Sequence, residues 1–490
     1  MSKQDLLGGI TILGLGPGNP QHLTRAAWDW LCQIPEVYLR TRHHPLVSAL
    51  PSSLKVYSFD EFYERNETFE GVYQQIVERV LELGQRPAGV TYAVPGHPYV
   101  AEATCPEIVR RARTVGIPVQ VIEGLSFLEP TFTALGVDPF PQMMLVDALE
   151  LGFAYHPIFP PSVPVLITQI YSREIAANVK LTLNEVYPDN YPVRLVHAAG
   201  TEQQIVEDLL LFEIDRSSQI GLLTALFLPA MEKETSFEEF QSLIAHLRSP
   251  EGCPWDREQT QQTLRTNLLE EAYEVLTALD TDDPTGLREE LGDLLLQIVL
   301  HTQIASELGE FKMTDVLAGI HRKIVRRHPH VFGELKLDSS DRVVRNWEAL
   351  KAAERRANGE HEVKGLLEGV PKALPALAQA QAYQTRAARV GFDWRDIAPV
   401  VEKVHEELDE LLCASDGNER ENELGDLLFA VVNLARWYRV DAESALRRTN
   451  ERFYRRFKYI EEKARQSGRD LHQMSLEEMD VFWEEAKGLE

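Results

Sequence analysis

The chain has 490 residues, and its 44% hydrophobic and 26% charged content is typical of globular proteins, with room for about three domains. Its 76 acidic residues outnumber 50 basic ones, so the net charge of −26 argues against nonspecific nucleic-acid binding, which requires a basic surface. The four cysteines form no C-x-x-C pair and no apolar run reaches the roughly 18 residues of a membrane span, so we expect a cytoplasmic protein without disulfides or a zinc site.

Residues 1–230 alternate short apolar runs with amphipathic helical stretches. The expected strands are 9–16, 36–39, 89–96 and 118–124 in a first half, and 164–171, 191–200 and 220–228 in a second half. The alternation predicts a two-part α/β fold with a largely parallel sheet.

Three loops rich in glycine and proline follow strands of this region: GLGPGNP (14–20), AVPGHP (93–98) and EGLSFLEP (123–130). Loops of this kind at strand ends describe a ligand cleft in an α/β domain. A plain NAD site is not expected, because Asn19 stands where the G-x-G-x-x-G fingerprint needs glycine and Pro17 lies inside the loop.

The three loops, in this order, resemble the tetrapyrrole methylase family of two-lobed methyltransferases over residues 8–228. The resemblance implies an S-adenosylmethionine cleft lined by Gly14, Gly16, Gly18, Pro95, Gly96, His97 and Ser126. Asn19 and His97 depart from this resemblance, since many members carry Asp at both positions. The sequence identifies no group that would position a methyl acceptor.

From residue 235 onward the hydrophobic period becomes helical, and a pattern of acids occurs twice. The first copy reads LLEEAYEVLTAL (268–279) and EELGDLLLQ (289–297), and the second reads HEELDELLCA (405–414) and NELGDLLFA (422–430). Each has the form E-E-x-x-E, a short connection, then E-x-x-D. The connection Asp282-Asp283-Pro284 supplies a helix cap and a first-turn proline.

The repeat is domain-sized. Glu271 and Glu407 lie 136 positions apart, and Glu290 and Glu423 lie 133 apart. We therefore expect three domains, with bounds 1–230 (α/β), 235–355 (all-α, first copy) and 370–490 (all-α, second copy).

Spacing of i, i+3 places two acids of each helix on one face, and antiparallel packing would bring four carboxylates together. We call these sets the first acid group (Glu271, Glu274, Glu290 and Asp293) and the second acid group (Glu407, Glu410, Glu423 and Asp426). Oxygen ligands alone suit Mg²⁺ or Mn²⁺, and the substrate that such a site suits is a metal-bound polyphosphate. The alternative is a solvated acidic helix face.

Basic and aromatic residues follow each acid group. In the second copy, Arg452 and Arg456 share a helix face and could clamp phosphates, while Trp483 and Lys487 could stack on a base and bind phosphate. For the tryptophans, core packing is the alternative interpretation.

The acid pattern, with GCPWD (252–256) before it and RRHPHVF (326–332) after it, resembles the MazG family. These are Mg²⁺-dependent hydrolases that convert a nucleoside triphosphate to the monophosphate and pyrophosphate, in four-helix-bundle folds completed by a second subunit. The resemblance covers 235–490 and implies a homodimer or larger. It places metal ligands on both acid groups and nucleotide contacts on Arg452, Arg456, Trp483 and Lys487, with Lys323, Arg327, Trp347 and Lys351 as first-copy counterparts.

A carboxylate not committed to metal would take the proton of the attacking water. Glu406 and Glu270 are the candidates, beside Glu407 and Glu410. Both acid groups are complete, and we favour the second copy as the active one.

The fusion of the two parts resembles YabN-type proteins of bacteria. The leading interpretation is a nucleoside triphosphate pyrophosphohydrolase of nucleotide-pool sanitation or alarmone control, which acts on neither nucleic acid nor membrane. One alternative is a methyltransferase whose helical half serves dimerisation. Another is a sensor, in which the first domain binds S-adenosylmethionine or a tetrapyrrole without turnover and biases the hydrolase.

Overall fold

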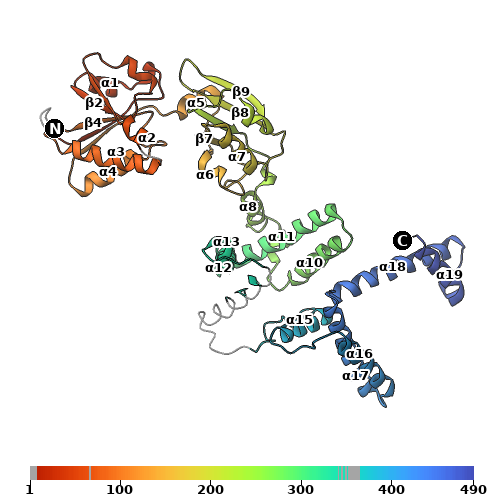
Figure 1. The fold of residues 1–490 in the computed structure, drawn as a ribbon. Helices are drawn as coiled ribbons and strands as arrows, with labels where there is room; N and C mark the ends of the chain where they lie inside the picture. The colour runs from red at the N-terminus through yellow and green to blue at the C-terminus, as the bar shows by residue number, and fades with distance from the viewer. Residues whose placement is uncertain are drawn as a thin grey trace. The chain divides into compact units, whose positions relative to one another are not determined.

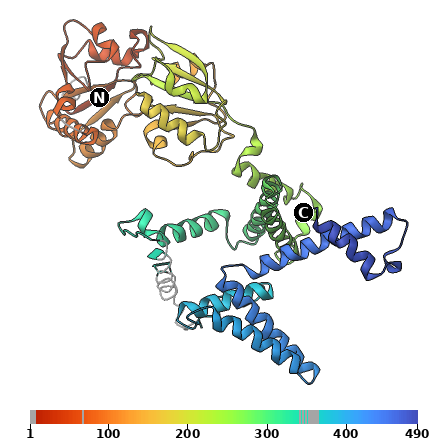
Figure 2. The same cartoon turned by 45° about the vertical axis from the view of Figure 1, so that its right-hand side comes forward.

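The computed structural model describes residues 8–65, 68–339, 342–343, 346–347, 350 and 365–489. The chain divides into two compact units, residues 1–246 and 247–490, seen in Figures 1 and 2. The three-domain division drawn from the sequence stays a prediction. Among the described residues, no helix is long and apolar enough to cross a membrane.

The first unit opens with a five-stranded sheet. Its strands are β1 (Ile10–Gly14), β2 (Glu36–Leu39), β3 (Lys55–Ser58), β4 (Val90–Val94) and β5 (Val119–Ile122). They lie in the order β3-β2-β4-β1-β5, and every pair is parallel, as the sequence predicted for this half. The carboxyl ends of β1, β4 and β5 therefore meet at one edge.

Helices cover both faces of this sheet. They are α1 (Arg25–Leu31), α2 (Asp60–Arg65), α3 (Phe69–Gly84) and α4 (Thr104–Thr114), with 3-10 turns at Pro20–His22 and Pro45–Ala49. Ile10 and Ile12 of β1 pack in one core with α3 and α4, whereas Leu13 packs in a second core with α1. The strands are buried on both faces, so they read as continuous apolar runs.

A second five-stranded sheet follows, and here the prediction of a largely parallel sheet was wrong. Its strands are β6 (Met144–Asp147), β7 (Val165–Thr168), β8 (Pro192–His197), β9 (Ile205–Leu210) and β10 (Thr224–Leu228), in the order β6-β7-β10-β8-β9. Only β6 and β7 pair in parallel, because β10 returns between β7 and β8 and is antiparallel to both. The loop of residues 198–204 joins β8 to β9, and the two strands pair as an antiparallel hairpin.

Helices also cover this second sheet. The covering elements are α5 (Leu128–Leu135), α6 (Ala148–Gly152), α7 (Arg173–Leu183) and a 3-10 helix at Leu211–Arg216, and a further 3-10 turn, Lys233–Thr235, follows the sheet. Leu226 of β10 packs in a core with α6 and α7, while Phe227 packs in another with α5. The sheet thus separates two apolar layers, as in the first half.

The described remainder of the chain is helical, as predicted. Its helices are α8 (Phe237–Leu247), α9 (Pro254–Glu258), α10 (Arg265–Asp280), α11 (Pro284–Glu307), α12 (Met313–Arg327), α13 (Pro329–Phe332), α15 (Ala376–Arg389), α16 (Ala398–Cys413), α17 (Gly417–Trp437), α18 (Ala442–Gln466) and α19 (Leu476–Lys487), with a 3-10 turn at Leu471–Gln473.

Two helical hairpins carry the acids: α10 with α11, and α16 with α17. The side chain of Asp283 caps α11 by accepting from the backbone N–H groups of Thr285 and Gly286, each at 3.0 Å, and Pro284 fills the first turn. Asp416 caps α17 in the same way. The predicted cap is confirmed, and the short connection folds each pair back on itself.

Candidate functional site

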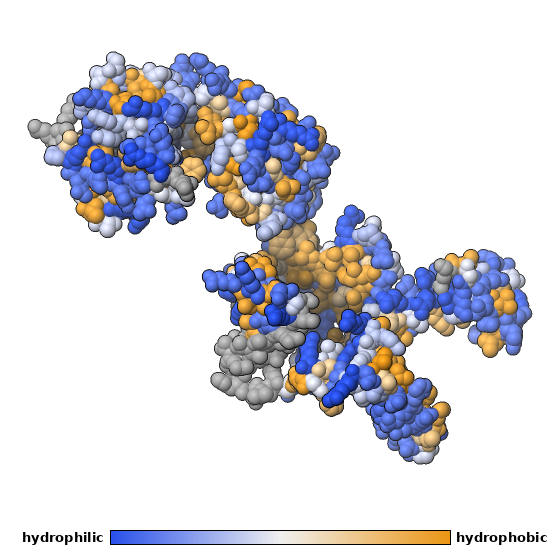
Figure 3. All heavy atoms as spheres, in the orientation of Figure 1, coloured by the Kyte–Doolittle hydropathy of each residue, from blue (hydrophilic) through white to orange (hydrophobic). Residues whose placement is uncertain are grey.

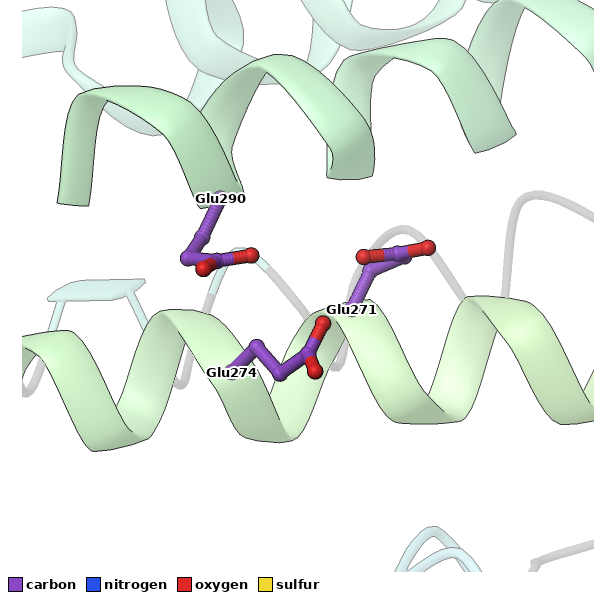
Figure 4. A group of neighbouring side chains, drawn as sticks. All are labelled: Glu271, Glu274 and Glu290. Atoms are coloured by element: carbon purple, nitrogen blue, oxygen red, sulfur yellow. The ribbon is translucent and has the colours of Figure 1, made fainter. Parts of the chain in front are cut away.

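The first acid group lies between the helices of its hairpin. Figure 4 shows Glu271 and Glu274 on α10 and Glu290 on α11, with their carboxyl groups turned toward the space between the helices. One ligand oxygen from each of these three lies within 4.8 Å of the others. Residues far apart in the sequence thus form one set of oxygen donors, which is what a divalent cation needs.

The electrostatics of this group are unfavourable without a cation. Loss of hydration raises the pKa of the Glu271 carboxyl, and a hydrogen bond with Glu274 and the charges of Asp293 and Glu290 raise it further. Loss of hydration also raises the pKa of Glu290, and the nearby charges add to the rise, with Glu274 the strongest of them. The charge of Asp293 acts on both Glu271 and Glu290, although Asp293 is not among the three residues that converge within 4.8 Å.

The second acid group repeats this geometry on α16 and α17. Glu407, Glu410 and Glu423 each offer one oxygen within 4.8 Å of the others, and Glu407 is only 5% exposed. Loss of hydration raises the pKa of Glu423, and Glu410, Asp426 and Glu407 add to the rise. Asp426 is therefore near the group in the same way that Asp293 is near the first.

A lysine that the sequence analysis missed belongs to the second acid group. Lys403 Nζ lies 2.6 Å from Glu407 and donates to Glu406 at 2.8 Å. These two carboxylates raise the pKa of Lys403. The spacing K-x-x-E-E would have revealed it, because residues i, i+3 and i+4 share a helix face. The first copy has Asn267 at the equivalent position, 136 residues earlier.

The proton-accepting candidates occupy the rims of the acid groups. Glu406 is exposed and shares Lys403 with Glu407, and Glu270 is exposed on α10. Neither is among the convergent oxygens, so both stay available for a role other than metal binding.

The basic and aromatic residues of the second copy gather on α18 and α19. The Arg456 guanidinium lies 5.4 Å from the centre of the Trp483 ring, which also packs against Phe453 at 5.3 Å. Arg452 donates to Thr449 at 3.0 Å, and Lys487 donates to Glu484 at 2.6 Å. The structure therefore brings Arg456 and Trp483 together.

In the first copy, Lys323 is exposed and Arg327 half-buried on α12, and the ring of Trp347 packs edge-on against His328 at 5.0 Å. Lys351 lies outside the described residues.

In the first unit, the predicted cleft residues meet at the carboxyl ends of β1, β4 and β5. Gly96 N–H donates to the Gly16 carbonyl at 2.8 Å, and Gly16 N–H donates to the Gly96 carbonyl at 3.2 Å. A Cβ added at Gly14 would lie 2.6 Å from the Gly96 oxygen, so only glycine fits there. A Cβ at Gly96 would meet nothing within 4 Å. Backbone groups are thus packed on one side of Gly96 and open space lies on the other.

The remaining cleft residues cap or flank these loops. Ser126 is buried and its Oγ accepts from Leu128 N–H at 3.0 Å, while His97 Nδ1 accepts from Tyr99 N–H at 3.1 Å. Gly18 lies beside Pro45, because a Cβ added at Gly18 would lie 3.2 Å from the Pro45 Cγ atom. Asn19 caps the turn that begins at Pro20, a role that asparagine and aspartate both fill.

His44 is a further cleft residue that sequence reasoning missed. It is 8% exposed, and its Nε2 bonds to the Gly16 carbonyl oxygen at 3.0 Å. Burial lowers its pKa. The bond anchors the glycine loop through its backbone, a contact for which the sequence offers no spacing signal.

Two known protein families match the chain, one in each half. The model of the tetrapyrrole (corrin/porphyrin) methylases matches residues 9–215, and that of the MazG nucleotide pyrophosphohydrolase domain matches residues 259–332.

Three curated relatives extend these matches. YabN of Bacillus subtilis (strain 168) is 42% identical over 99% of both chains. The nucleoside triphosphate pyrophosphohydrolase/pyrophosphatase MazG of Thermotoga maritima is 46% identical over 51% of this chain and 96% of its own. The nucleoside triphosphate pyrophosphohydrolase of Escherichia coli (strain K12) is 44% identical over 50% of this chain and 95% of its own.

The geometry predicts that Mn²⁺ binds at two places in each chain. We expect electron paramagnetic resonance titration to lose one site in Glu271→Gln/Glu290→Gln and the other in Glu407→Gln/Glu423→Gln. Binding should be weaker at pH 5 than at pH 7.5, because the raised carboxyl pKa values let protons compete with the metal. Asp409→Asn, an exposed acid between Glu407 and Glu410, is the matched control and should bind as wild type. Equal titrations in all variants would contradict the assignment.

Proposed function

Because the chain belongs to the MazG family of nucleotide pyrophosphohydrolases, joined as in YabN to a tetrapyrrole methylase unit, we propose that it hydrolyses nucleoside triphosphates to monophosphates and pyrophosphate. The observation that carries the proposal is the convergence of three carboxylates in each helical hairpin. On a solvated helix face the carboxylates would be expected to point away from one another, because like charges repel. A cytoplasmic location is part of this proposal, because nucleoside triphosphates are metabolites of that compartment.

The donor set fits a hard divalent cation, Mg²⁺ or Mn²⁺. All donors are carboxylate oxygens, and loss of hydration together with their mutual repulsion raises the pKa values of Glu271, Glu290 and Glu423. When bound there, the cation would neutralise phosphate oxygens and acidify a water molecule.

The protein's own residues supply the rest. Glu406 or Glu270, at the rim, would accept the proton of the attacking water. Arg452, Arg456 and Lys487 would hold the phosphate charge, and Trp483, whose ring packs with the Arg456 guanidinium, would contact the nucleotide beside them. Lys323, Arg327, Trp347 and Lys351 would have these roles in the first copy.

We assign turnover to the second copy. Lys403 shares Glu407 there, which gives this group a cation able to contact phosphate, whereas the first copy has Asn267. A cavity of about 400 Å³, lined by Glu407 and Asp426, adjoins the second group.

Product analysis tests the reaction. With Mg²⁺ and ATP, GTP, CTP or UTP, we expect monophosphate and pyrophosphate, and none after chelation with EDTA. Glu407→Gln should lower kcat by about a hundredfold or more, because it removes a buried metal ligand. Glu271→Gln should change kcat by less than about threefold. Release of orthophosphate and nucleoside diphosphate would contradict the proposal. If only Glu271→Gln lost activity, the first copy would be the active one.

The hairpin α10–α11 also leaves apolar surface uncovered, which supports a homodimer or larger assembly. Figure 3 shows apolar side chains gathered over this hairpin. The exposed ones are Leu269, Leu276, Leu279, Leu291, Leu295 and Ile298, with exposed fractions from 37% to 55%. Two helices cannot enclose the apolar surface of both, so the same surface of a second chain is the proposed partner.

Charge on this surface should break the assembly. For Leu291→Lys/Ile298→Lys we expect light scattering coupled to gel filtration to give the 55.6 kDa of one chain, and for wild type at least twice that mass. Leu308→Lys, at the exposed end of α11, is the control. A wild-type mass of one chain would refute the assembly.

For the first unit we propose S-adenosylmethionine binding by Gly14, Gly16, Gly18, Pro95, Gly96, His97 and Ser126, with methyl transfer as a second activity. The open space beside Gly96 favours a ligand at this edge. The alternative is a sensor that binds without turnover, which Asn19 and His97 favour.

Gly96→Ala tests the ligand site. Its methyl group would enter the open space, so calorimetric titration should show at least tenfold weaker binding of S-adenosylhomocysteine. Gly116→Ala is a matched control, since its φ of +74° is close to the +68° of Gly96 and its Cβ also meets nothing within 4 Å. The two variants should melt alike, which separates backbone strain from occlusion. Equal affinities would count against the site.

A further inference from the structure

The cavity beside the second acid group has a wall suited to a flat ring. Aromatic side chains line it from three elements: Tyr383 on α15, Phe392 and Trp394 in the loop before α16, and Phe429 on α17. Phe392, Trp394 and Phe429 are all exposed, with Phe392 at 83%. The cavity has a volume of about 400 Å³. Aromatic side chains along such a cavity can form a stacking platform for a nucleobase.

The cavity also has a polar lining built from two buried amides. Gln384 is 9% exposed, and its Nε2 donates to the Phe429 carbonyl at 2.8 Å. This bond fixes the orientation of the amide. Its Oε1 is buried and has no hydrogen-bond partner. A buried acceptor without a donor is unfavourable, and an N–H group of a ligand would satisfy it.

Asn433, 6% exposed, lies one helical turn after Phe429 on α17. Its Oδ1 accepts from Arg436 Nε at 2.9 Å, and Asp393 holds the Arg436 guanidinium at 2.6 and 2.9 Å. Because the oxygen is engaged, the Nδ2 group is the part of Asn433 that can donate to a ligand. The lining therefore offers an acceptor on α15 and a donor on α17, two helices in contact with each other.

We propose that this cavity is a nucleoside pocket in which Gln384 accepts from an N–H of the base and Asn433 donates to a ring nitrogen or carbonyl. Every natural base presents such a donor and acceptor on one edge, so the pocket would take all four but reject a base without an N–H. This inference rests on the proposed function, because Glu407 and Asp426 line the cavity and would direct the phosphates to the metal.

The first copy lacks this lining. At the 133-residue offset, Leu300 stands at the position of Asn433 and Gln303 at that of Arg436. Leu300 is 4% exposed and packs as a core residue. Base recognition by these amides is therefore specific to the second copy.

The test compares ATP with purine riboside 5′-triphosphate, which lacks the exocyclic amino group and has no N–H on its base. For the wild-type full-length protein, we expect kcat/KM to be roughly tenfold to hundredfold higher for ATP, because the analogue leaves Gln384 Oε1 unpaired. In Gln384→Leu that ratio should fall to about one. Gln379→Leu, on the same helix but outside the cavity lining, is the matched control and should keep the wild-type ratio.

A second variant covers the outcome in which Gln384→Leu does not fold. Asn433→Leu installs the residue that the first copy carries at this position, and it should lower kcat/KM for ATP by about tenfold. An ATP preference that survives in both variants, or its absence from the wild type, would overturn the pocket.

Binding separates this inference from the proposed function. If no triphosphate is hydrolysed, the proposed function fails, and titration of adenosine against purine riboside then decides the pocket. Preference for adenosine that is lost in Gln384→Leu would uphold it, and equal binding of the two nucleosides would overturn it.

Discussion

Repulsion among carboxylates held close together is the constraint on which the helical half depends. In each hairpin three glutamate oxygens lie within 4.8 Å, and loss of hydration together with neighbouring charge raises the pKa values of Glu271, Glu290 and Glu423. Such a group opposes folding of the hairpin at neutral pH unless a cation joins it. The sign follows from the raised pKa values, since the folded group holds protons that the unfolded one releases as the pH rises above the ordinary carboxyl range.

The two copies answer this constraint differently. In the second, the Lys403 ammonium already lies between Glu406 and Glu407, so part of the repulsion is relieved within the chain. In the first, Asn267 supplies no charge. Both copies keep the four acids of their pattern, and the lysine and amides that accompany the second group distinguish them.

Local spacing predicted what depends on one element and its neighbour. The acid positions, the Asp283 cap and the parallel first sheet follow from i, i+3 spacing, a helix-start signal and alternating periods, and the structure has each of them. Lys403 also lay within reach of such spacing. Lys403 and Glu407 are an i, i+4 pair on one helix face, a spacing that can be recognised in the sequence.

Pairing across long distances in the sequence was not predictable in this way. Gln384 and Asn433 come from α15 and α17 and line the same cavity, and the Gln384 amide bonds the Phe429 carbonyl between the two helices. Likewise, His44 reaches the Gly16 carbonyl from a different loop. These contacts depend on how separate elements pack together, which the spacing of residues within one element does not indicate.

The placement of β10 has a consequence for the synthesis of the protein. This strand is the last of the first unit, yet it forms hydrogen bonds with both β7 and β8 at the middle of the second sheet. Until Thr224–Leu228 leaves the ribosome, β7 and β8 have no partner between them, and Leu166 and Leu195 cannot be enclosed. The second sheet can therefore be completed only after nearly all of its unit has been translated. By then, synthesis of the helical half has begun. A truncation before residue 224 would remove the central strand of that sheet and leave the pairs β6-β7 and β8-β9.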